Sequence, residues 1–169
     1  MNSNVRPHSP YLVQIIGPST PAAQHCERIL RSLPQWFGIE ESLLEYVADS
    51  ERFSTFFAIE SEPVAFLTVR EHFPQSWEVH CIGVLASHRG GGIGRKLHSH
   101  VEDWLRIKGA KALQVKTLSP GHPSPEYAET RQFYAAMGYL PLEVFPTLWG
   151  PKLPVLQLVK VLAAPTSAA

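Results

Sequence analysis

The feature that most constrains this chain is a glycine-rich turn, residues 89–94, which joins an apolar segment to an amphipathic one. The preceding residues, 79–85, are mostly apolar and rich in β-branched side chains, and they predict a buried strand. Beyond the turn, Leu97, Val101 and Leu105 recur at helical spacing. A strand, a glycine-rich turn and a helix in this order direct the free backbone N–H groups of the helix N-terminus toward an anion. The stretch therefore predicts a binding site for a phosphate group.

The spacing of the turn separates three kinds of phosphate site. A P-loop requires a hydroxyl residue after its lysine, whereas Lys96 is followed by leucine. A dinucleotide-binding fingerprint requires a third glycine where this chain has Arg95. Arg89, Gly92 and Gly94 instead form Arg-x-x-Gly-x-Gly, which resembles the pyrophosphate-binding motif of the acetyl-CoA-dependent N-acetyltransferases of the GNAT superfamily. The alternative is an ordinary tight turn between a strand and a helix.

Composition excludes several classes of partner. Among 169 residues, 15 are basic and 15 are acidic, so no net field would attract nucleic acid or an anionic membrane. The two cysteines, Cys26 and Cys81, lack the paired spacing of metal ligands, which favours a reducing compartment without a disulfide or a metal site. Residues 1–10 contain no apolar signal-peptide core, and no apolar run has the length of a membrane span. We therefore expect a cytoplasmic protein.

The remaining segments predict a mixed α/β fold. Apolar runs and alternation indicate strands, and apolar residues at helical spacing indicate helices. Ser19 or Thr20 would cap the first helix, with Pro21 at its first position. The strand at 111–118 follows a helix, so we expect it to lie parallel to the strand at 79–85. The expected elements are strands at 11–16, 53–59, 64–69, 79–85, 111–118, 139–145 and 155–162, and helices at about 22–33, 39–52, 95–108 and 126–137.

A second motif lies in the last expected helix. Phe133 and Tyr134 are followed by three residues and then by Gly138 and Tyr139, a pattern that resembles the signature of the penultimate helix in the GNAT superfamily. The alternative is a helix with an aromatic core face and a glycine at its end. With both motifs in the right order, the chain is identified as a member of the superfamily. The resemblance implies one N-acetyltransferase domain over residues 11–162, with the order β-α-α-β-β-β-α-β-α-β-β and flexible termini at 1–10 and 163–169.

The resemblance implies acetyl-CoA as a cosubstrate and no metal. In this family the thioester arm lies between the two central parallel strands, where one backbone N–H of the first strand faces the thioester carbonyl. The corresponding positions are Ile82, Gly83 and Val84, and the Val84 N–H is the expected oxyanion donor. Gly83 could equally be a packing glycine. The pyrophosphate would bind at Arg89, Gly90, Gly91, Gly92, Ile93, Gly94 and Arg95.

The resemblance also supplies catalytic candidates. Tyr134 matches the tyrosine that protonates the departing thiolate, although a core tyrosine would give the same pattern. Glu78 precedes Arg89 by the offset of the catalytic glutamate in some members (89 − 78 = 11), and His80 would share its face of the strand. Either side chain or water alone could act as the base, or both could line an exposed strand end. Tyr127 stands where many members have an asparagine that contacts the cofactor.

The implied activity is direct transfer of an acetyl group from acetyl-CoA to a primary amine in a ternary complex. The alternative is a binding module that keeps the acyl-CoA site without turnover and acts as a sensor or partner. The acceptor would be a small-molecule amine or a peptide amine. Trp36, Phe37, Trp77 and Trp149 are candidates for an acceptor pocket, although aromatic residues more often lie in the core. The resemblance also implies a possible homodimer, in which the late strands and residues 149–154 could pair across subunits.

Overall fold

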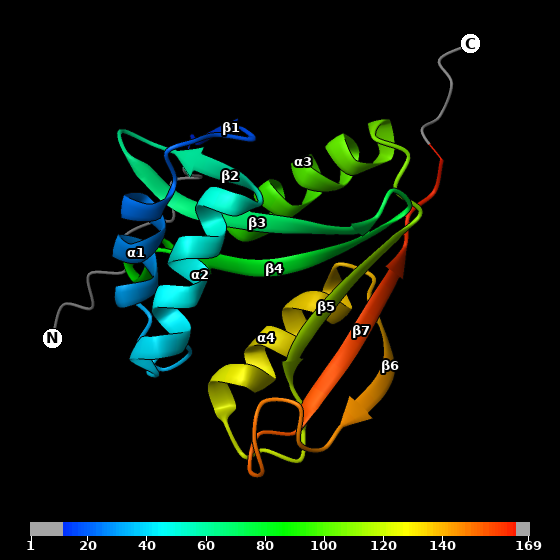
Figure 1. Ribbon diagram of the computed structural model, residues 1–169. Helices are drawn as coiled ribbons and strands as arrows, with labels where there is room; N and C mark the ends of the chain where they lie inside the picture. The colour runs from blue at the N-terminus through cyan, green and yellow to red at the C-terminus, as the bar shows by residue number, and fades with distance from the viewer. Residues whose placement is uncertain (1–11, 165–169) are drawn as a thin grey trace, which may run out of the picture.

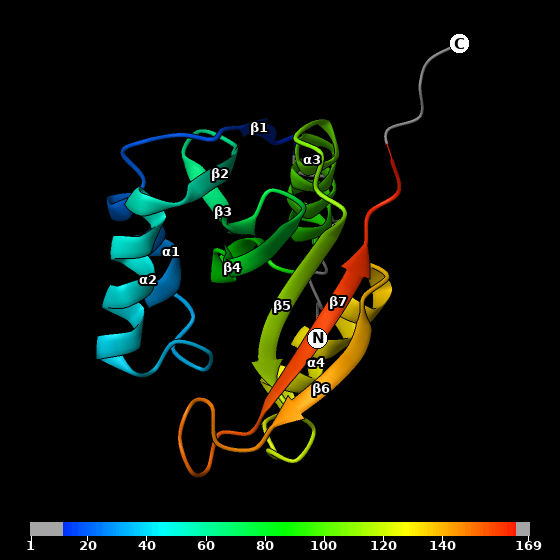
Figure 2. The same ribbon diagram turned by 45° about the vertical axis from the view of Figure 1, so that its right-hand side comes forward.

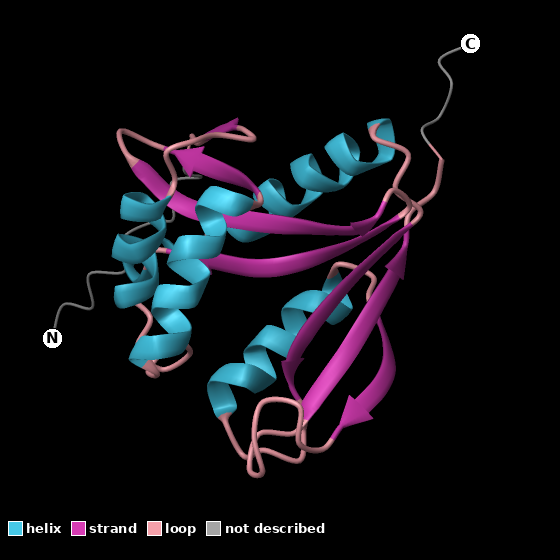
Figure 3. Ribbon diagram, in the orientation of Figure 1, coloured by secondary structure: helices cyan, strands magenta, loops and turns pink. Residues whose placement is uncertain are grey.

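A computed structural model describes residues 12–164, which form one seven-stranded mixed sheet with helices on both faces (Figure 1, Figure 3). The expected flexible termini, residues 1–10 and most of 163–169, lie outside the described residues. Across the sheet the strands follow the order β1-β2-β3-β4-β5-β7-β6. Their bounds are β1 Gln14–Ile16, β2 Ser54–Ile59, β3 Pro63–Phe73, β4 Ser76–Val84, β5 Ala112–Leu118, β6 Leu140–Phe145 and β7 Val155–Val161.

Four helices connect the strands in the described part of the chain, and the order of elements confirms the predicted fold class. None of the helices within residues 12–164 has the length and apolar character of a membrane span. A short 3₁₀ turn, Ala86–His88, lies between β4 and the glycine-rich turn. The helices are α1 Ala23–Arg31, α2 Glu40–Arg52, α3 Ile93–Ile107 and α4 Pro125–Ala136.

The helices divide the core into two layers. The helices α1 and α2 cover one face of the sheet, and α3 and α4 pack on the other (Figure 2). Because side chains alternate along a strand, β2 contributes to both layers: Phe56 packs in the α3 layer and Phe57 packs beneath α1. Burial of these large apolar side chains is the main favourable contribution to folding.

The strands β4 and β5 lie parallel, as predicted, but over only part of their length. Residues 76–79 of β4 pair with residues 112–115 of β5, and beyond them the two strands separate into a V (Figure 1). Beyond that point β4 stays paired with β3, and β5 stays paired with β7. The register of β4 against β3 shifts where the V opens, which makes His80 the extra residue of a β-bulge. The fold therefore leaves one edge of each central strand unpaired.

The start of the first helix differs from the prediction. Pro21 precedes α1 instead of opening it, and the hydroxyls of Ser19 and Thr20 do not cap it. The Glu51 carboxylate of α2 accepts hydrogen bonds from the backbone N–H groups of residues 22–23, at 2.6 and 2.7 Å. A distant carboxylate thus replaces the local cap, and its negative charge suits a helix N-terminus. This contact also ties the two helices of one layer together.

The strand β3 is longer than predicted, because it continues from residue 69 to Phe73. Residues 70–72 are charged or polar and exposed, so they show no apolar alternation. Backbone pairing with β4, including Arg70 opposite Glu78, holds this extension in the sheet.

A buried charge network joins α3 to the last strands. The Glu102 side chain is 5% exposed and pairs with Lys160 of β7 and with Arg106 of its own helix. His98 Nδ1 lies 3.0 Å from Glu102 Oε1, and His98 Nε2 lies 2.7 Å from the Tyr139 hydroxyl. Burial alone would raise the pKa of Glu102, but hydrogen bonds with His98 and Lys160 lower it from 4.5 to about 2. The ionised carboxylate therefore stabilises the folded state.

We predict that Glu102→Gln removes this stabilisation. Since the folded-state pKa is depressed, the contribution of Glu102 is present above pH 4.5 and is lost as the pH falls from 4.5 to about 2. The free energy of unfolding at pH 7 should fall by about 3 kcal/mol, and the acid sensitivity over that pH interval should weaken. Urea denaturation as a function of pH measures both. The exposed Glu143 supplies a control, Glu143→Gln, and an unchanged pH profile in Glu102→Gln would contradict the assignment.

Candidate active site

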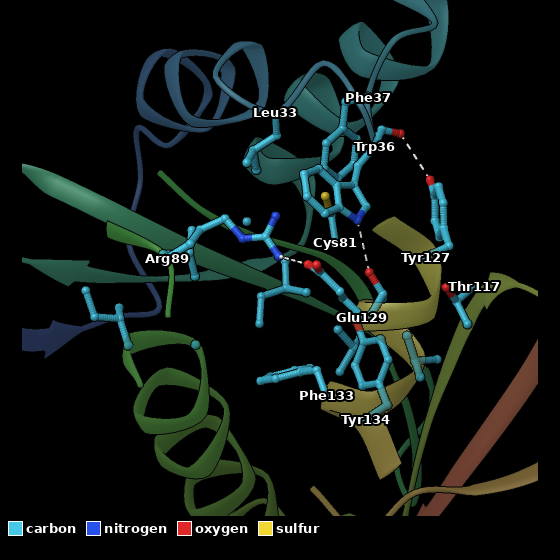
Figure 4. A pocket seen from close by; sticks show the side chains of 18 of the residues that line it. Leu33, Trp36, Phe37, Cys81, Arg89, Thr117, Tyr127, Glu129, Phe133 and Tyr134 are labelled. Carbon is cyan, nitrogen blue, oxygen red and sulfur yellow. Dashed lines mark hydrogen bonds and ion pairs between the residues drawn. The ribbon is translucent and has the colours of Figure 1, made fainter. Parts of the chain in front are cut away.

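A cavity of about 330 Å³ occupies the V between β4 and β5 (Figure 4). Its walls come from the separating ends of both strands, the loop after α1, the first turn of α3 and one side of α4. Cavities of this size hold small ligands or parts of larger ones. The cavity brings together most of the residues that the sequence analysis singled out, although they come from segments far apart in the chain.

The glycine-rich turn forms the wall at the N-terminus of α3. Gly90 and Gly92 have φ angles of +79° and +80°, a left-handed conformation that favours glycine. A Cβ atom at either position would meet no atom within 4 Å, so the backbone faces open space. The N–H groups of residues 93–95 occupy the first helical turn and have no acceptor within the helix. This wall can therefore bind an anion, whereas Gly91 does not line the cavity.

The side chain of Arg89 crosses the cavity mouth instead of pointing into solvent. Its guanidinium lies 4.0 Å from the centre of the Trp36 ring, and its Nη2 lies 3.5 Å from Glu129 Oε2 of α4 (Figure 4). The Trp36 indole N–H donates to Thr130 Oγ1 at 3.1 Å, and Tyr127 donates its hydroxyl proton to the Trp36 carbonyl at 3.0 Å. The loop after α1 is thus connected to α4 across the cavity.

The edge of β4 inside the V presents unpaired backbone groups. The Leu85 N–H donates to the Val64 carbonyl of β3 at 2.8 Å. Because N–H directions alternate along a strand, the Gly83 N–H also points toward β3, while those of Ile82 and Val84 point into the V. An extended ligand could pair with these two groups as an added strand would.

Gly83 itself is crowded on the side away from the cavity. A Cβ atom there would lie 3.1 Å from Ile29 Cγ2 and 3.1 Å from Phe66 Cε1. These atoms belong to α1 and β3, so the missing side chain lets α1 pack on the sheet. The packing role considered for Gly83 thus has direct support, although the residue also lines the cavity.

On the opposite wall, β5 contributes an unsatisfied hydroxyl. Thr117 is 2% exposed, and its Oγ1 has no hydrogen-bond partner within residues 12–164. An unpaired buried hydroxyl costs about 1–3 kcal/mol. A ligand group in the V could satisfy it.

Tyr134 projects from α4 toward the cavity (Figure 4). It is 3% exposed, and its ring packs edge-on against Phe133 and Tyr139, with centroids 5.3 and 5.2 Å apart. Burial raises the pKa of the Tyr134 hydroxyl well above its ordinary value, so the group stays protonated. Because its side chain lines the cavity, the hydroxyl proton is within reach of a ligand there.

The two candidate bases occupy different environments. Glu78 is 7% exposed and does not line the cavity. Its carboxylate bonds to Lys116 Nζ at 2.9 Å and to the His72 ring. Burial opposes ionisation, but these two partners lower the pKa of Glu78 below its ordinary value. A carboxylate that is already bonded to Lys116 and His72 is a weak base, and this one does not line the cavity.

His80 does line the cavity, and its ring is held on several sides. Its Nε2 lies 2.9 Å from Asp49 Oδ2 of α2. The rings of Tyr46 and Phe53 approach it edge-on at centroid distances of 5.3 Å each. An imidazole fixed by a carboxylate has the arrangement of a general base with an orienting partner.

Sequence reasoning found some cavity residues and missed others. Trp36, Phe37 and Trp149 line the cavity, whereas Trp77 is 7% exposed and packs against Trp104 in the core. Asp49 was missed, because an acidic residue on an amphipathic helix is ordinarily solvated. The sequence offered one indication of its place: Asp49 follows Tyr46 by three residues, so the two side chains lie on the same face of a helix.

Comparison with known proteins identifies the family. Residues 22–139 match the Acetyltransferase (GNAT) family, and this match covers more than half of the chain. The chain therefore belongs to the GNAT family of acetyltransferases. None of the curated proteins matches it in sequence.

Several solved structures share the fold. A GNAT-family protein from Desulfovibrio desulfuricans has a TM-score of 0.76 at 18% identity, with 89% of this chain and 99% of that chain covered. An aminoglycoside 6′-N-acetyltransferase complexed with coenzyme A has a TM-score of 0.70 at 19% identity, covering 91% and 99%. The ribosomal-protein-S18-alanine N-acetyltransferase from Escherichia coli has a TM-score of 0.71 at 16% identity, covering 94% and 100%. At these identities the likeness establishes the fold alone.

Proposed function

We propose that the protein transfers the acetyl group of acetyl-CoA directly to a primary amine while both substrates are bound. The observation that carries the proposal is that one cavity collects an anion-binding helix terminus, an unpaired strand edge and a protonated tyrosine. A neighbouring structure with the same fold holds coenzyme A, which agrees with this arrangement. Release of free thiol together with formation of an N-acetyl product tests the proposal.

The residues of the cavity fit the parts of acetyl-CoA. The N–H groups of residues 93–95, with Gly90 and Gly92, would bind the pyrophosphate. The backbone of Ile82 and Val84 would pair with the amides of the thioester arm. The orphan hydroxyl of Thr117 offers a further hydrogen bond on the β5 side. The thioester supplies the activated acetyl group, and the protein supplies orientation and proton transfer.

His80 is the proposed base. The attacking amine must be neutral, and the imidazole can accept its proton directly or through a water. Asp49 positions the ring and compensates the charge that this proton brings. Since a strand rises about 3.3 Å per residue, Ile82 lies nearer to His80 than Val84 does. The Ile82 N–H is therefore the better oxyanion donor when His80 is the base. The Val84 N–H would then donate a hydrogen bond to the thioester arm of acetyl-CoA.

Tyr134 would assist the departure of the thiolate. The amine nitrogen forms a bond to the carbonyl carbon, the carbon–sulfur bond breaks, and the electron pair of that bond goes to sulfur. The Tyr134 hydroxyl donates a hydrogen bond to the sulfur as its charge develops, and overall the proton lost by the amine ends on the thiol. Because burial raises its pKa, Tyr134 is a weak acid. Its contribution to kcat should therefore lie at the low end of the range for general acids.

We also propose a homodimer formed through β6. This strand is at the edge of the sheet, and its apolar residues Leu140, Leu142 and Val144 are 65%, 61% and 48% exposed. An exposed apolar edge strand usually has a partner. Light scattering should give twice the mass of the chain, and Leu142→Glu should give the monomer. A monomeric wild-type protein at working concentration contradicts this proposal.

We predict that Gly94→Asp abolishes coenzyme A binding and leaves the fold intact. An aspartate in the first turn suits the helix dipole, but its charge would oppose the pyrophosphate, so affinity should fall at least about 100-fold. Gly94→Ala is the matched control, because its Cβ would lie 3.4 Å from Val84 Cγ2, an ordinary contact. Calorimetry that shows equal affinity in Gly94→Asp and in the wild type would refute the assigned pyrophosphate site.

We predict that His80→Gln and Glu78→Gln separate the two candidate bases. Loss of the base should lower kcat about 10²–10³-fold, so His80→Gln should show this loss. Glu78→Gln should retain most of kcat and lower the melting temperature, because Lys116 and His72 lose their partner. Steady-state kinetics, measured well below the melting temperature of both variants, gives the two kcat values to compare. The reverse pattern would make Glu78 the base.

We predict that Tyr134→Phe lowers kcat about 100-fold with little change in the KM for acetyl-CoA. Phenylalanine keeps the ring and its packing against Phe133 and Tyr139, so the melting temperature should stay unchanged. Calorimetry and thiol release on one purified variant give both quantities. Full activity would exclude Tyr134 from the chemistry and favour the alternative of a core tyrosine.

A further inference from the structure

The side of the cavity that faces α1 and α2 is built from aromatic rings. We call Trp36, Phe37, Tyr46 and Tyr127 the aromatic wall; all four line the cavity. Phe37 and Tyr46 meet edge-on with centroids 5.8 Å apart, and Tyr46 in turn contacts His80. Burial raises the pKa of Tyr46 and of Tyr127, so both stay neutral. The surface beside the proposed base is therefore uncharged and suited to stacking.

Acidic groups at the cavity are already paired. Within residues 12–164, Glu129 is the only carboxylate that lines the cavity, and it faces the Arg89 guanidinium. Asp49 is bonded to His80, and Glu78 is bonded to Lys116. Basic side chains also line the cavity, namely His80, His88, Arg89, Arg95 and Lys116. An acceptor with several ammonium groups would meet the cations Arg89, Arg95 and Lys116 without a free carboxylate to hold it.

Hydrogen bonds also link the loop after α1 to α4 across the cavity. Trp36 reaches α4 through its indole N–H, which bonds to Thr130 Oγ1 at 3.1 Å, and Tyr127 holds the Trp36 carbonyl at 3.0 Å (Figure 4). These contacts limit the width of the cavity beside the aromatic wall. They leave room for a small molecule.

From the aromatic wall, the paired carboxylates and these hydrogen bonds across the cavity, we infer that the acceptor is a small monoamine that carries an aromatic ring. Its ring stacks in the aromatic wall, and its amino group lies beside His80. This inference rests on the proposed function, because it assigns the acceptor of the same site. Aromatic contacts of this kind are worth about 0.5–1.5 kcal/mol beyond simple burial, which corresponds to about 2- to 13-fold in affinity.

The test compares 2-phenylethylamine with spermidine, kanamycin and an alanine-terminated tripeptide, with acetyl-CoA as donor. We expect the highest kcat/KM for 2-phenylethylamine, by at least about tenfold. Phe37→Leu keeps the apolar character but removes the ring, so the KM for 2-phenylethylamine should rise about 3- to 10-fold. The affinity for coenzyme A should not change. The matched control is Phe73→Leu, at a side chain that is 71% exposed and remote from the cavity.

The outcomes separate this inference from the proposed function. A higher kcat/KM for spermidine, kanamycin or the peptide overturns the inference and leaves the acetyltransferase assignment standing. If no amine is acetylated although coenzyme A binds, the proposed activity fails. The inference about the acceptor is then tested separately, by calorimetry of amine binding to the coenzyme A complex. Tighter binding of 2-phenylethylamine than of spermidine then supports it. Equal or weaker binding overturns it.

Discussion

The separation of β4 from β5 is the constraint on which the site depends. The two strands pair over residues 76–79 and 112–115, after which each keeps only its outer neighbour. A buried strand edge without partners is unfavourable, because its N–H and C=O groups have lost water. The V therefore favours a ligand that can pair as a strand does. The bulge at His80 lies where the V opens, so the same irregularity ends the pairing and turns the imidazole toward the cavity.

The two sides of the V differ in chemistry. One side presents backbone N–H groups at the start of α3 and along β4, which suit the phosphates and amides of a nucleotide cosubstrate. The other side presents aromatic rings, with His80 held by Asp49 at the boundary. Arg89 reaches from the first side to Trp36 and Glu129 on the second. Arg89 thus connects the two sides of the V, while Trp36 keeps its hydrogen bonds with Thr130 and Tyr127.

Much of the fold followed from local patterns in the sequence. The glycine-rich turn was recognisable because two positions need a left-handed backbone, and the parallel arrangement of β5 followed from the intervening helix. The cap of α1 could not be found locally, because Glu51 lies almost thirty residues away. The end of β3 was missed because its charged, exposed residues are held by pairing alone.

The choice between Glu78 and His80 also lay beyond sequence reasoning. Both residues fall on one strand two positions apart, and only the bulge and the partners on α2 and β5 give them different environments. Tyr134, in contrast, was proposed from its resemblance to the family motif, and the structure places its side chain at the cavity.

Hydrogen–deuterium exchange with and without coenzyme A tests the central claim, that the V between β4 and β5 is the cosubstrate site. The account predicts slower exchange at the amides of Ile82 and Val84 and at residues 93–95, because these groups gain acceptors. Amides on β6 should exchange at the same rate in both states. Binding of coenzyme A without protection at Ile82, Val84 and residues 93–95, or with protection confined to other strands, would contradict the account.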